Sequence, residues 1–591
     1  MKNKKYLFEY IKKSWQIDRK STFALILMRV IVAINISVEA LLLSKLINDI
    51  VASVNNNNVT FIYSLVFIIG VWIINMLCNI FYKMTEEKLR IKLSQTLTLI
   101  LTRKKANIKY SILENADNQD LMERIGTDPS DKFISAIKNS ILFLEYIIQF
   151  ISLLLIIATK QWFIAIIVGL LIIPFYIMAL KNGEEEYDAY EESAKHFRRS
   201  KYFRLILSDR EHANERTLFG YGKYINKKWH DEFSNAIKIE DKANRKVYTS
   251  LGISACISIL LLGFIAVAML FPLKNSYLSI GFYIAILKAI INYIESITSS
   301  FSQIIQELEK SVFYYSDFKM LMDLEENSNT EKKDININKI EKIEFNNVSF
   351  KYPNTDRYIL NDLSFTLYGN KQYAFVGHNG AGKSTIIKLL TGFYCDYDGT
   401  IKINGTDIKE INRNSLNNIF SVVYQDYSKY QISLGDNLFC GAENKTSLSN
   451  EEKEILNDLN FDKTFGNFET SLDIPLGKLD EEGIDLSGGQ WQSIAIARSL
   501  MSNASVHILD EPTSAIDPIK EANLYKMFAK RMNNKFAIYI THRLGAAKMT
   551  DEILVLSNGK VIEKGNHDEL MKHNSVYCEM YETQRSWYNE I

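Results

Sequence analysis

The feature that most constrains the fold is a set of long apolar stretches in the first half of the chain. Six of them lie at about 22–43, 60–82, 137–158, 161–181, 249–271 and 278–301. A helix rises ~1.5 Å per residue, so each stretch can cross the ~30 Å hydrocarbon core of a bilayer. Arg29 and Glu39 interrupt the first stretch and no small-residue cleavage site follows it, so we expect a retained span rather than a secretory signal. We therefore predict a six-span helical membrane domain.

The connections between these stretches predict how the chain lies in the membrane. Segments 83–136 and 182–248 are long and rich in Lys and Arg, whereas the other connections are short. By the positive-inside rule the long connections and both termini are cytoplasmic. Residues 6–20 mix aromatic and basic side chains, which favours an interfacial amphipathic helix over a solvated basic tail. Richness in Asn, Lys and Ile is typical of an AT-rich bacterial genome and points to the bacterial plasma membrane.

Charge and cysteine content exclude several classes of protein. The 69 Lys and Arg balance 69 Asp and Glu, which removes the electrostatic case for nucleic acid as a partner. Five cysteines lie without CxxC spacing, which argues against zinc ribbons and disulfide frameworks.

The second half of the chain predicts a separate domain. We assign 1–325 to the membrane domain, 326–338 to a polar linker and 339–591 to an α/β domain. Within the long inner connections, 111–125 and 205–221 each predict short polar helices that could transmit force to a cytoplasmic partner. Ordinary corners of helical hairpins would have the same pattern. Charge reversals at Asp117, Glu123, Asp209 and Glu211 would distinguish the two interpretations.

A phosphate-binding motif opens the α/β domain. The apolar strand 372–376 runs directly into Gly377, His378, Asn379, Gly380, Ala381, Gly382, Lys383 and Ser384, followed by Thr385. This is GxxxxGK[ST] between a strand and a helix, the context in which backbone N–H groups enclose nucleotide phosphates. Lys383 adds a positive charge for the β and γ oxygens, and Ser384 a ligand for Mg²⁺.

A second apolar strand, 506–509, ends in Asp510 and Glu511. Asp510 is placed to hold the magnesium shell. Glu511, one residue further on, can polarise the attacking water as a general base.

The decisive motif is Leu486-Ser487-Gly488-Gly489-Gln490, which lies between these two elements and precedes a helical run. With it the chain resembles the ABC ATPases, and with six preceding spans it resembles an exporter-type ABC half-transporter. The resemblance covers nearly the whole chain. It implies an α-helical membrane domain of exporter type followed by an α/β P-loop ATPase domain.

The resemblance also implies roles for individual residues, with ATP and Mg²⁺ as cofactors. Tyr352 would stack on adenine, Gln425 would bind the metal and sense the γ-phosphate, and His542 would contact the γ-phosphate. Asp517 would lie in the loop that connects two ATP sites. Ser487, Gly488, Gly489 and Gln490 would reach ATP bound to the opposite subunit. One chain then cannot complete a site, so we expect a homodimer, or a heterodimer with a related half-transporter.

The substrate is indicated only indirectly. The chain resembles exporters of lanthipeptides and related ribosomally made, modified peptides at two places, the run Val423-Tyr-Gln-Asp-Tyr-Ser-Lys-Tyr430 and Trp491. About 20 residues precede the first span, too few for the protease domain of some peptide exporters. A multidrug or lipid exporter would have the same motifs, and an exporter-fold importer of metal chelates is a further alternative.

Polar residues on the sixth span predict a cargo path. Lys288, Asn292, Glu295 and Ser299 share one side of a helix, and such groups avoid lipid, so this side is expected to face a cavity between subunits. They could instead be scaffolding, with Lys288 and Glu295 neutralising each other or pairing with Arg29 and Glu39.

Overall fold

The computed structural model describes residues 5–56, 61–210, 212–275, 277–327, 339–440, 447–466, 471–479, 481–511, 518–572 and 575–589. The chain divides into two units. The first unit comprises Met1–Ala106 and Gln119–Leu324, and the second comprises Asn107–Asn118 and Glu325–Ile591. The second unit begins next to the predicted boundary at residue 325. It also contains the short segment Asn107–Asn118, which sequence reasoning assigned to the membrane domain.

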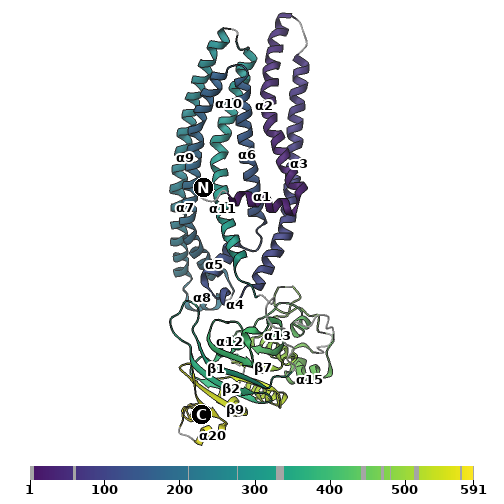
Figure 1. Ribbon diagram of the computed structural model, residues 1–591, viewed down its shortest axis with the longest axis vertical. Coiled ribbons are helices and arrows are strands. Elements are labelled where there is room, and N and C mark those ends of the chain that lie inside the picture. Colours follow the sequence, from purple (N-terminus) through teal and green to yellow (C-terminus); the bar gives the residue numbers. More distant parts are fainter. Residues whose placement is uncertain are drawn as a thin grey trace. The chain divides into compact units, whose positions relative to one another are not determined.

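Long helices that run alongside one another build the first unit (Figure 1). They are α2 (Arg19–Asn56), α3 (Phe61–Asn107), α6 (Ser130–Ala158), α7 (Trp162–Ser208), α9 (Gly222–Lys274), α10 (Ile280–Ser296) and α11 (Ser302–Asp323), with a π-helical turn η1 (Ile297–Phe301) between the last two. Helix α7 packs along α9, and α10 packs along α2. Each of the six predicted spans coincides with one of these elements or, for 278–301, with α10 and η1, except for one or two residues at the start of three of the spans.

Four of these helices are long and apolar enough to cross a membrane by length and composition: α2, α3, α6 and α9, counted over the residues that the structure describes. The spans predicted at 161–181 and 278–301 stay predictions. The second of these is divided by η1, so that α10 alone has 17 residues.

The N-terminal amphipathic helix is present as α1 (Lys5–Ile17). Its Tyr10 is completely buried and donates a 2.7 Å hydrogen bond to the carbonyl oxygen of Ser311. The same ring makes edge contacts with Phe133 and Tyr315. These contacts exclude a merely solvated tail for this segment.

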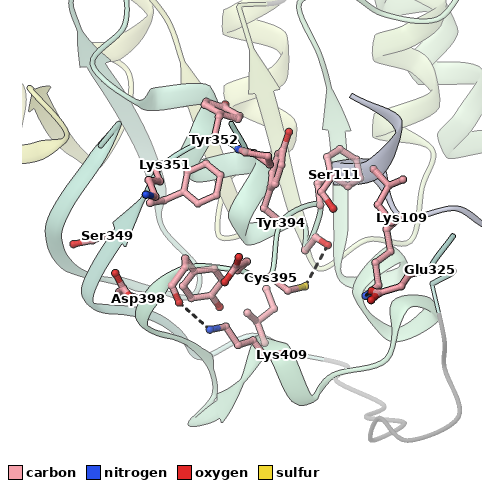
Figure 2. Close-up of a pocket in the computed structure, with 18 of the residues that line it drawn as sticks. Lys109, Ser111, Glu325, Ser349, Lys351, Tyr352, Tyr394, Cys395, Asp398 and Lys409 are labelled. Carbon is pink, nitrogen blue, oxygen red and sulfur yellow. Dashed lines mark hydrogen bonds and ion pairs between the residues drawn. The ribbon is translucent and has the colours of Figure 1, made fainter. Parts of the chain in front are cut away.

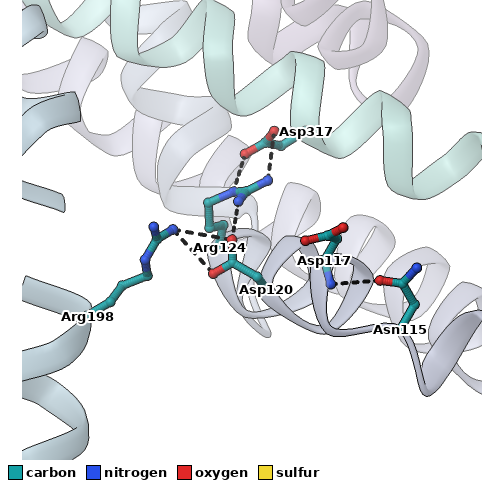
Figure 3. A network of polar contacts seen from close by, with 6 residues as sticks. All are labelled: Asn115, Asp117, Asp120, Arg124, Arg198 and Asp317. Atoms are coloured by element: carbon teal, nitrogen blue, oxygen red, sulfur yellow. Dashed lines mark hydrogen bonds and ion pairs between the residues drawn. The ribbon is translucent and has the colours of Figure 1, made fainter. Parts of the chain in front are cut away.

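The first inner connection contains two short helices, α4 (Tyr110–Leu113) and α5 (Ala116–Ile125). On α5, Arg124 pairs with Asp120 and donates to Asp317 of α11 at 2.9 Å (Figure 3). Arg198 of α7 approaches the same Asp120 at 3.2 Å. Charge pairs therefore hold α5 to two long helices of its unit. In the second inner connection, α8 (Ala213–Phe219) lies within the predicted helical segment 205–221.

Two sheets form the frame of the second unit. The four-stranded antiparallel sheet has the order β2-β1-β4-β5, and the six-stranded sheet has the order β10-β9-β3-β8-β7-β6. The strands are β1 (Lys342–Phe350), β2 (Leu360–Tyr368), β3 (Gln372–Gly377), β4 (Asp398–Ile403), β5 (Thr406–Asp407), β6 (Phe420–Val423), β7 (Val506–Asp510), β8 (Phe536–Ile540), β9 (Glu552–Ser557) and β10 (Lys560–Gly565). In the six-stranded sheet only β10 runs antiparallel to its neighbour. Strands β3, β7 and β8 are buried along their whole length, as expected for parallel strands covered on both faces.

Helices of the second unit cover the sheets, and several of them contribute to a second apolar cluster. The helices are α12 (Lys383–Leu390), α13 (Arg413–Ile419), α14 (Leu434–Leu438), α15 (Asn450–Asp458), α16 (Phe461–Phe465), α17 (Gly488–Leu500), α18 (Pro518–Arg531), α19 (Leu544–Ala547), α20 (His567–Lys572) and α21 (Val576–Asn589), with a 3₁₀ turn η2 (Ile408–Glu410). Leu438 of α14, Leu456 of α15 and Trp491 of α17 share one buried cluster. This second core supports the helix that begins with the LSGGQ motif.

Candidate functional site

The sheet order brings four separate chain segments to one edge. In the parallel register Asp510 of β7 lies opposite Ile540 of β8, and Ile540 lies opposite Phe375 of β3. Val423 of β6 lies opposite Leu509 of β7. The phosphate loop, Glu511, His542 and Gln425 each follow one of these strand ends. In α/β folds this carboxyl edge is where ligands bind.

Glycine conformation builds the phosphate loop. Gly380 and Gly382 have φ angles of 79° and 102°, in the left-handed region that other residues avoid. A Cβ atom on Gly382 would come within 2.6 Å of the Leu360 side chain, so a larger residue would have to displace Leu360 and would also strain the backbone. Helix α12 begins directly afterwards at Lys383, and its N-terminal N–H groups form a site for anions.

Lys383 and Asp510 are buried charges within this site. The Lys383 ammonium donates to the carbonyl oxygens of Gly377 at 2.9 Å and His378 at 3.2 Å, and burial lowers the pKa of Lys383. Burial raises the pKa of Asp510 to about 6, although the Ser384 hydroxyl opposes this rise by donating to its carboxylate at 3.2 Å. The charged form of each side chain is stabilised when a group of opposite charge enters the site, because burial has removed water from both side chains.

Glu511 has a strained backbone at the end of β7. Its φ angle of 46° is uncommon for a residue with a side chain, and its N–H donates to the Ile540 carbonyl oxygen at 3.0 Å. The carboxylate lies 2.6 Å from Nε2 of His542. Strain of this kind clusters at functional sites, because the surrounding structure must maintain it.

His542 contacts two charged side chains, the Glu511 carboxylate and the Lys383 ammonium. Its Nε2 is 2.6 Å from Glu511 and 3.3 Å from the Lys383 ammonium. Burial, together with Lys383, lowers the pKa of His542. The neutral imidazole is therefore the favoured form, and its Nε2–H can donate to the Glu511 carboxylate. The hydrogen bond thus fixes the Glu511 carboxylate beside the imidazole.

The LSGGQ motif forms the start of α17. Ser487 is the N-cap residue, and Gln490 completes a reciprocal capping box: the Ser487 N–H donates to Gln490 Oε1 at 2.8 Å. Such a box fixes the first turn of a helix. Gly488 and Gly489 are the first residues of α17 and carry no side chain that would shield the helix N-terminus. Trp491 is buried in the adjoining core.

Tyr352 contacts the phosphate loop and lines a cavity. Its hydroxyl lies 3.0 Å from Thr385 Oγ1, and the Lys388 ammonium is 5.3 Å from its ring centre. The cavity measures about 870 Å³ and also contains Lys109 and Ser111 in its lining (Figure 2). The predicted adenine residue is thus next to the phosphate site.

The remaining predicted residues are placed as follows. His378, Asn379 and Gly380 are exposed on the phosphate loop, and Ala381 is buried. Gln425 is exposed directly after β6. Asp517 and Glu211 lie outside the described residues.

Glu114, which follows α4, lies in the predicted segment 111–125, but the sequence did not single it out as a polar centre. Its carboxylate accepts from the Lys388 ammonium at 2.9 Å and from the Tyr110 hydroxyl at 2.7 Å, and it also contacts the Tyr394 hydroxyl. Tyr110 stacks on Phe393 at 4.5 Å. These contacts explain why Asn107–Asn118 belongs to the second unit. An isolated Glu in a polar loop carries no sequence signal of such a role.

Comparison with known proteins identifies the class. The ABC transporter family profile matches residues 360–514. The subtilin transport ATP-binding protein SpaT of Bacillus subtilis is 32% identical over 578 residues, covering 96% of this chain and 92% of that protein. The nisin transport ATP-binding protein NisT of Lactococcus lactis subsp. lactis is 26% identical over 590 residues, covering 97% and 95%. A bacterial Atm1-family ABC exporter solved with ATP bound has the same fold, with a TM-score of 0.77 at 20% identity, covering 96% and 98% of the two chains.

The fold and the site define a nucleotide-driven membrane transporter. The chain belongs to the ABC transporters, with an ATPase domain fused to an exporter-type membrane domain. It binds ATP and couples its hydrolysis to transport. The predicted class, the exporter-type fold and the activity are confirmed, whereas the number of membrane spans stays a prediction.

Proposed function

We propose that this transporter exports a ribosomally made, modified peptide of the lanthipeptide type. The observation that carries the proposal is that two relatives, named for transport of subtilin and nisin, match over nearly the whole chain, including the membrane unit. The Val423–Tyr430 run and Trp491 agree with this assignment. Export then proceeds by alternating access, driven by two nucleotide domains that close on ATP.

The working unit in this proposal is a homodimer in the bacterial plasma membrane, with termini and ATPase domains cytoplasmic. Ser487 and Gly489 of one copy complete the ATP site of the other, because α17 presents its N-terminal N–H groups to the γ-phosphate. Asp517 connects the two sites, and Tyr352 stacks on adenine. A related half-transporter as the second subunit is the alternative.

Within each site the residues have distinct roles. Glu511 accepts a proton from the attacking water, and His542 orients Glu511 and contacts the γ-phosphate. Lys383 neutralises charge on the transferred phosphoryl group. The Ser384 hydroxyl and the Asp510 carboxylate converge within 3.2 Å and are the hard oxygen ligands that Mg²⁺ prefers, with Gln425 as a third ligand. The metal, when bound, neutralises charge on the β and γ oxygens.

The substrate assignment is tested in proteoliposomes. We expect a modified, leader-bearing peptide to stimulate ATP hydrolysis and to accumulate inside vesicles whose ATPase domains face outward. The unmodified peptide and a panel of lipophilic drugs and lipids serve as comparisons. Stimulation by drugs or lipids but not by the peptide would favour the multidrug or lipid alternative. ATP-driven transport out of these vesicles would favour the importer.

Helix α10 carries the predicted cargo residues on one side. Lys288, Asn292 and Glu295 are exposed, whereas Ile286, Ile290 and Tyr293 are buried on the other side; the Ser299 side chain lies outside the described part of the chain. The Lys288 ammonium is 3.9 Å from Glu39, one of the two scaffolding partners considered above. The other, Arg29, pairs with Glu145 at 3.5 Å instead.

We expect Glu295→Gln to reduce transport of a cationic peptide several-fold while basal ATPase activity and the Tm stay close to wild type. The reason is that loss of a charge in the cargo path weakens attraction of the cargo, whereas the buried side of α10 is unchanged. Transport of a neutral peptide variant is the control. If stability and all activities fall together, this side of α10 is scaffolding.

A further inference from the structure

The loop that follows β6, residues 425–432, is held at several points by the signature helix α17. The Tyr427 hydroxyl donates to the carbonyl oxygen of Gly488 at 2.7 Å. Arg498, in the last turn of α17, donates to the carbonyl oxygen of Ser428 at 3.2 Å, and its guanidinium lies 4.6 Å from the centre of the Tyr430 ring. We refer to residues 425–432 as the sensor loop, because its first residue, Gln425, is the expected sensor of the γ-phosphate.

Arg498 is itself fixed from the opposite side by Asn437 of α14. It donates to the Asn437 carbonyl oxygen at 2.9 Å and to Asn437 Oδ1 at 2.5 Å. The fully buried Asn437 amide in turn donates to the Tyr430 carbonyl oxygen at 3.0 Å. A charged donor with several aligned acceptors resists displacement, since each lost bond leaves a desolvated group. Arg498 and Asn437 therefore hold Ser428 and Tyr430 of the sensor loop to α14 and to the last turn of α17, whereas Tyr427 contacts the first turn of α17.

The hydrogen bond of Tyr427 connects two segments that lie at the proposed ATP sites. Tyr427 is two residues from Gln425, at the carboxyl edge of the sheet where the phosphate loop also lies. Gly488 is the first residue of α17, between Ser487 and Gly489 of the signature. One hydrogen bond thus joins the beginning of the γ-phosphate-sensing loop to the helix terminus that binds the other ATP.

We propose that Tyr427 is a positioning residue that links the two ATP sites of the dimer. A shift of Gln425 when ATP binds at a chain's own site displaces Tyr427. Tyr427 then reorients the first turn of α17, which the same chain presents to its partner's ATP. The inference rests on the proposed dimer with shared sites. It predicts that Tyr427 acts in trans. Loss of the Tyr427 hydroxyl should impair the ATP site of the partner subunit, which the signature helix of the same chain completes. The ATP site of the chain that carries the substitution should be unaffected.

A dimer with two different tags separates these effects. Both subunits are purified as full-length protein, and Glu511→Gln in one copy leaves a single competent site. Tyr427→Phe, which removes the hydroxyl and keeps the ring, is then placed on either copy, and hydrolysis of bound ATP is followed in a single turnover. We expect a slowing of fivefold or more when Tyr427→Phe is on the copy that supplies the signature helix. On the copy with the competent Glu511 we expect less than twofold.

Controls distinguish the inference from the proposed dimer. Tyr430→Phe removes a hydroxyl from the same loop and should leave both rates within twofold. Ser487→Ala on each copy tests whether signatures act in trans at all. If Ser487→Ala acts only on its own chain's site, the shared-site dimer is wrong. A second outcome would contradict the link through Tyr427 alone. In that outcome Ser487→Ala acts in trans, but Tyr427→Phe slows hydrolysis equally on either copy, or more on the copy with the competent Glu511.

Discussion

Replacing Glu511 with glutamine is expected to reduce steady-state ATP turnover by ~10²-fold or more, the contribution typical of a general base. ATP binding should remain within a few-fold of wild type. The amide cannot accept a proton from water, but the groups that we propose to hold the phosphates are untouched: Lys383, Ser384 and the N-terminus of α12. Because closure of the two nucleotide domains needs ATP but not its cleavage, the variant should accumulate as a nucleotide-bridged dimer.

The measurement is phosphate release together with binding of a fluorescent ATP analogue. Lys383→Ala is the contrasting variant, because it should lose binding as well as turnover. His542→Gln should be intermediate, since its imidazole lies 2.6 Å from Glu511 and orients a base that is still present. Retention of more than about a tenth of wild-type turnover by Glu511→Gln would exclude Glu511 as the general base, given the ~10²-fold minimum for that role.

Elements with a strong local signal could be predicted from the sequence. The strand before Gly377, the helix after it and the strand that ends at Asp510 were all expected, because apolar runs and glycine spacing are local properties. The apolar segments 343–352 and 358–367 also indicate a pair of strands, and this pair is confirmed as the antiparallel pair β1–β2. The long apolar runs likewise became helices.

Contacts between distant segments could not be predicted in the same way. The order β3-β8-β7-β6, which brings the end of β6 beside the end of β7, depends on pairing between strands far apart in the sequence. The capping box on Ser487 has a local pattern, whereas the bond from Tyr427 to Gly488 has none. Glu114 was missed for the same reason: its partners Lys388 and Tyr394 lie more than 270 positions away.

The second large effect is expected from substitution of Glu114, which should remove the coupling between substrate and ATP hydrolysis. Lys388, which donates to Glu114, is on the helix that begins at Lys383, and its ammonium also lies over the Tyr352 ring. A shift of α12 on nucleotide binding would therefore act directly on Glu114. The chain continues from Glu114 into the long membrane helices α3 on one side and α6 on the other.

We expect Glu114→Gln to lower peptide transport about tenfold or more, while basal ATPase activity stays within about twofold. Hydrogen bonds to a charged group contribute ~1.5–3 kcal/mol each, and ~1.4 kcal/mol corresponds to tenfold in an equilibrium, so loss of one charged bond is sufficient. Peptide stimulation of hydrolysis should disappear as well. Transport and ATPase rates are measured on the same proteoliposomes.

The matched control for Glu114→Gln is Glu123→Gln in the same inner connection. Glu123 pairs with Lys201 at 2.6 Å, but both side chains are more than half exposed, and such pairs contribute little to stability. Sequence reasoning treated Glu123 as a coupling residue, whereas the contacts of Glu114 with Lys388 and Tyr394 make Glu114 the stronger candidate. If Glu123→Gln uncouples transport and Glu114→Gln does not, the signal passes along α5 and its charge pairs with α7 and α11 rather than through α12.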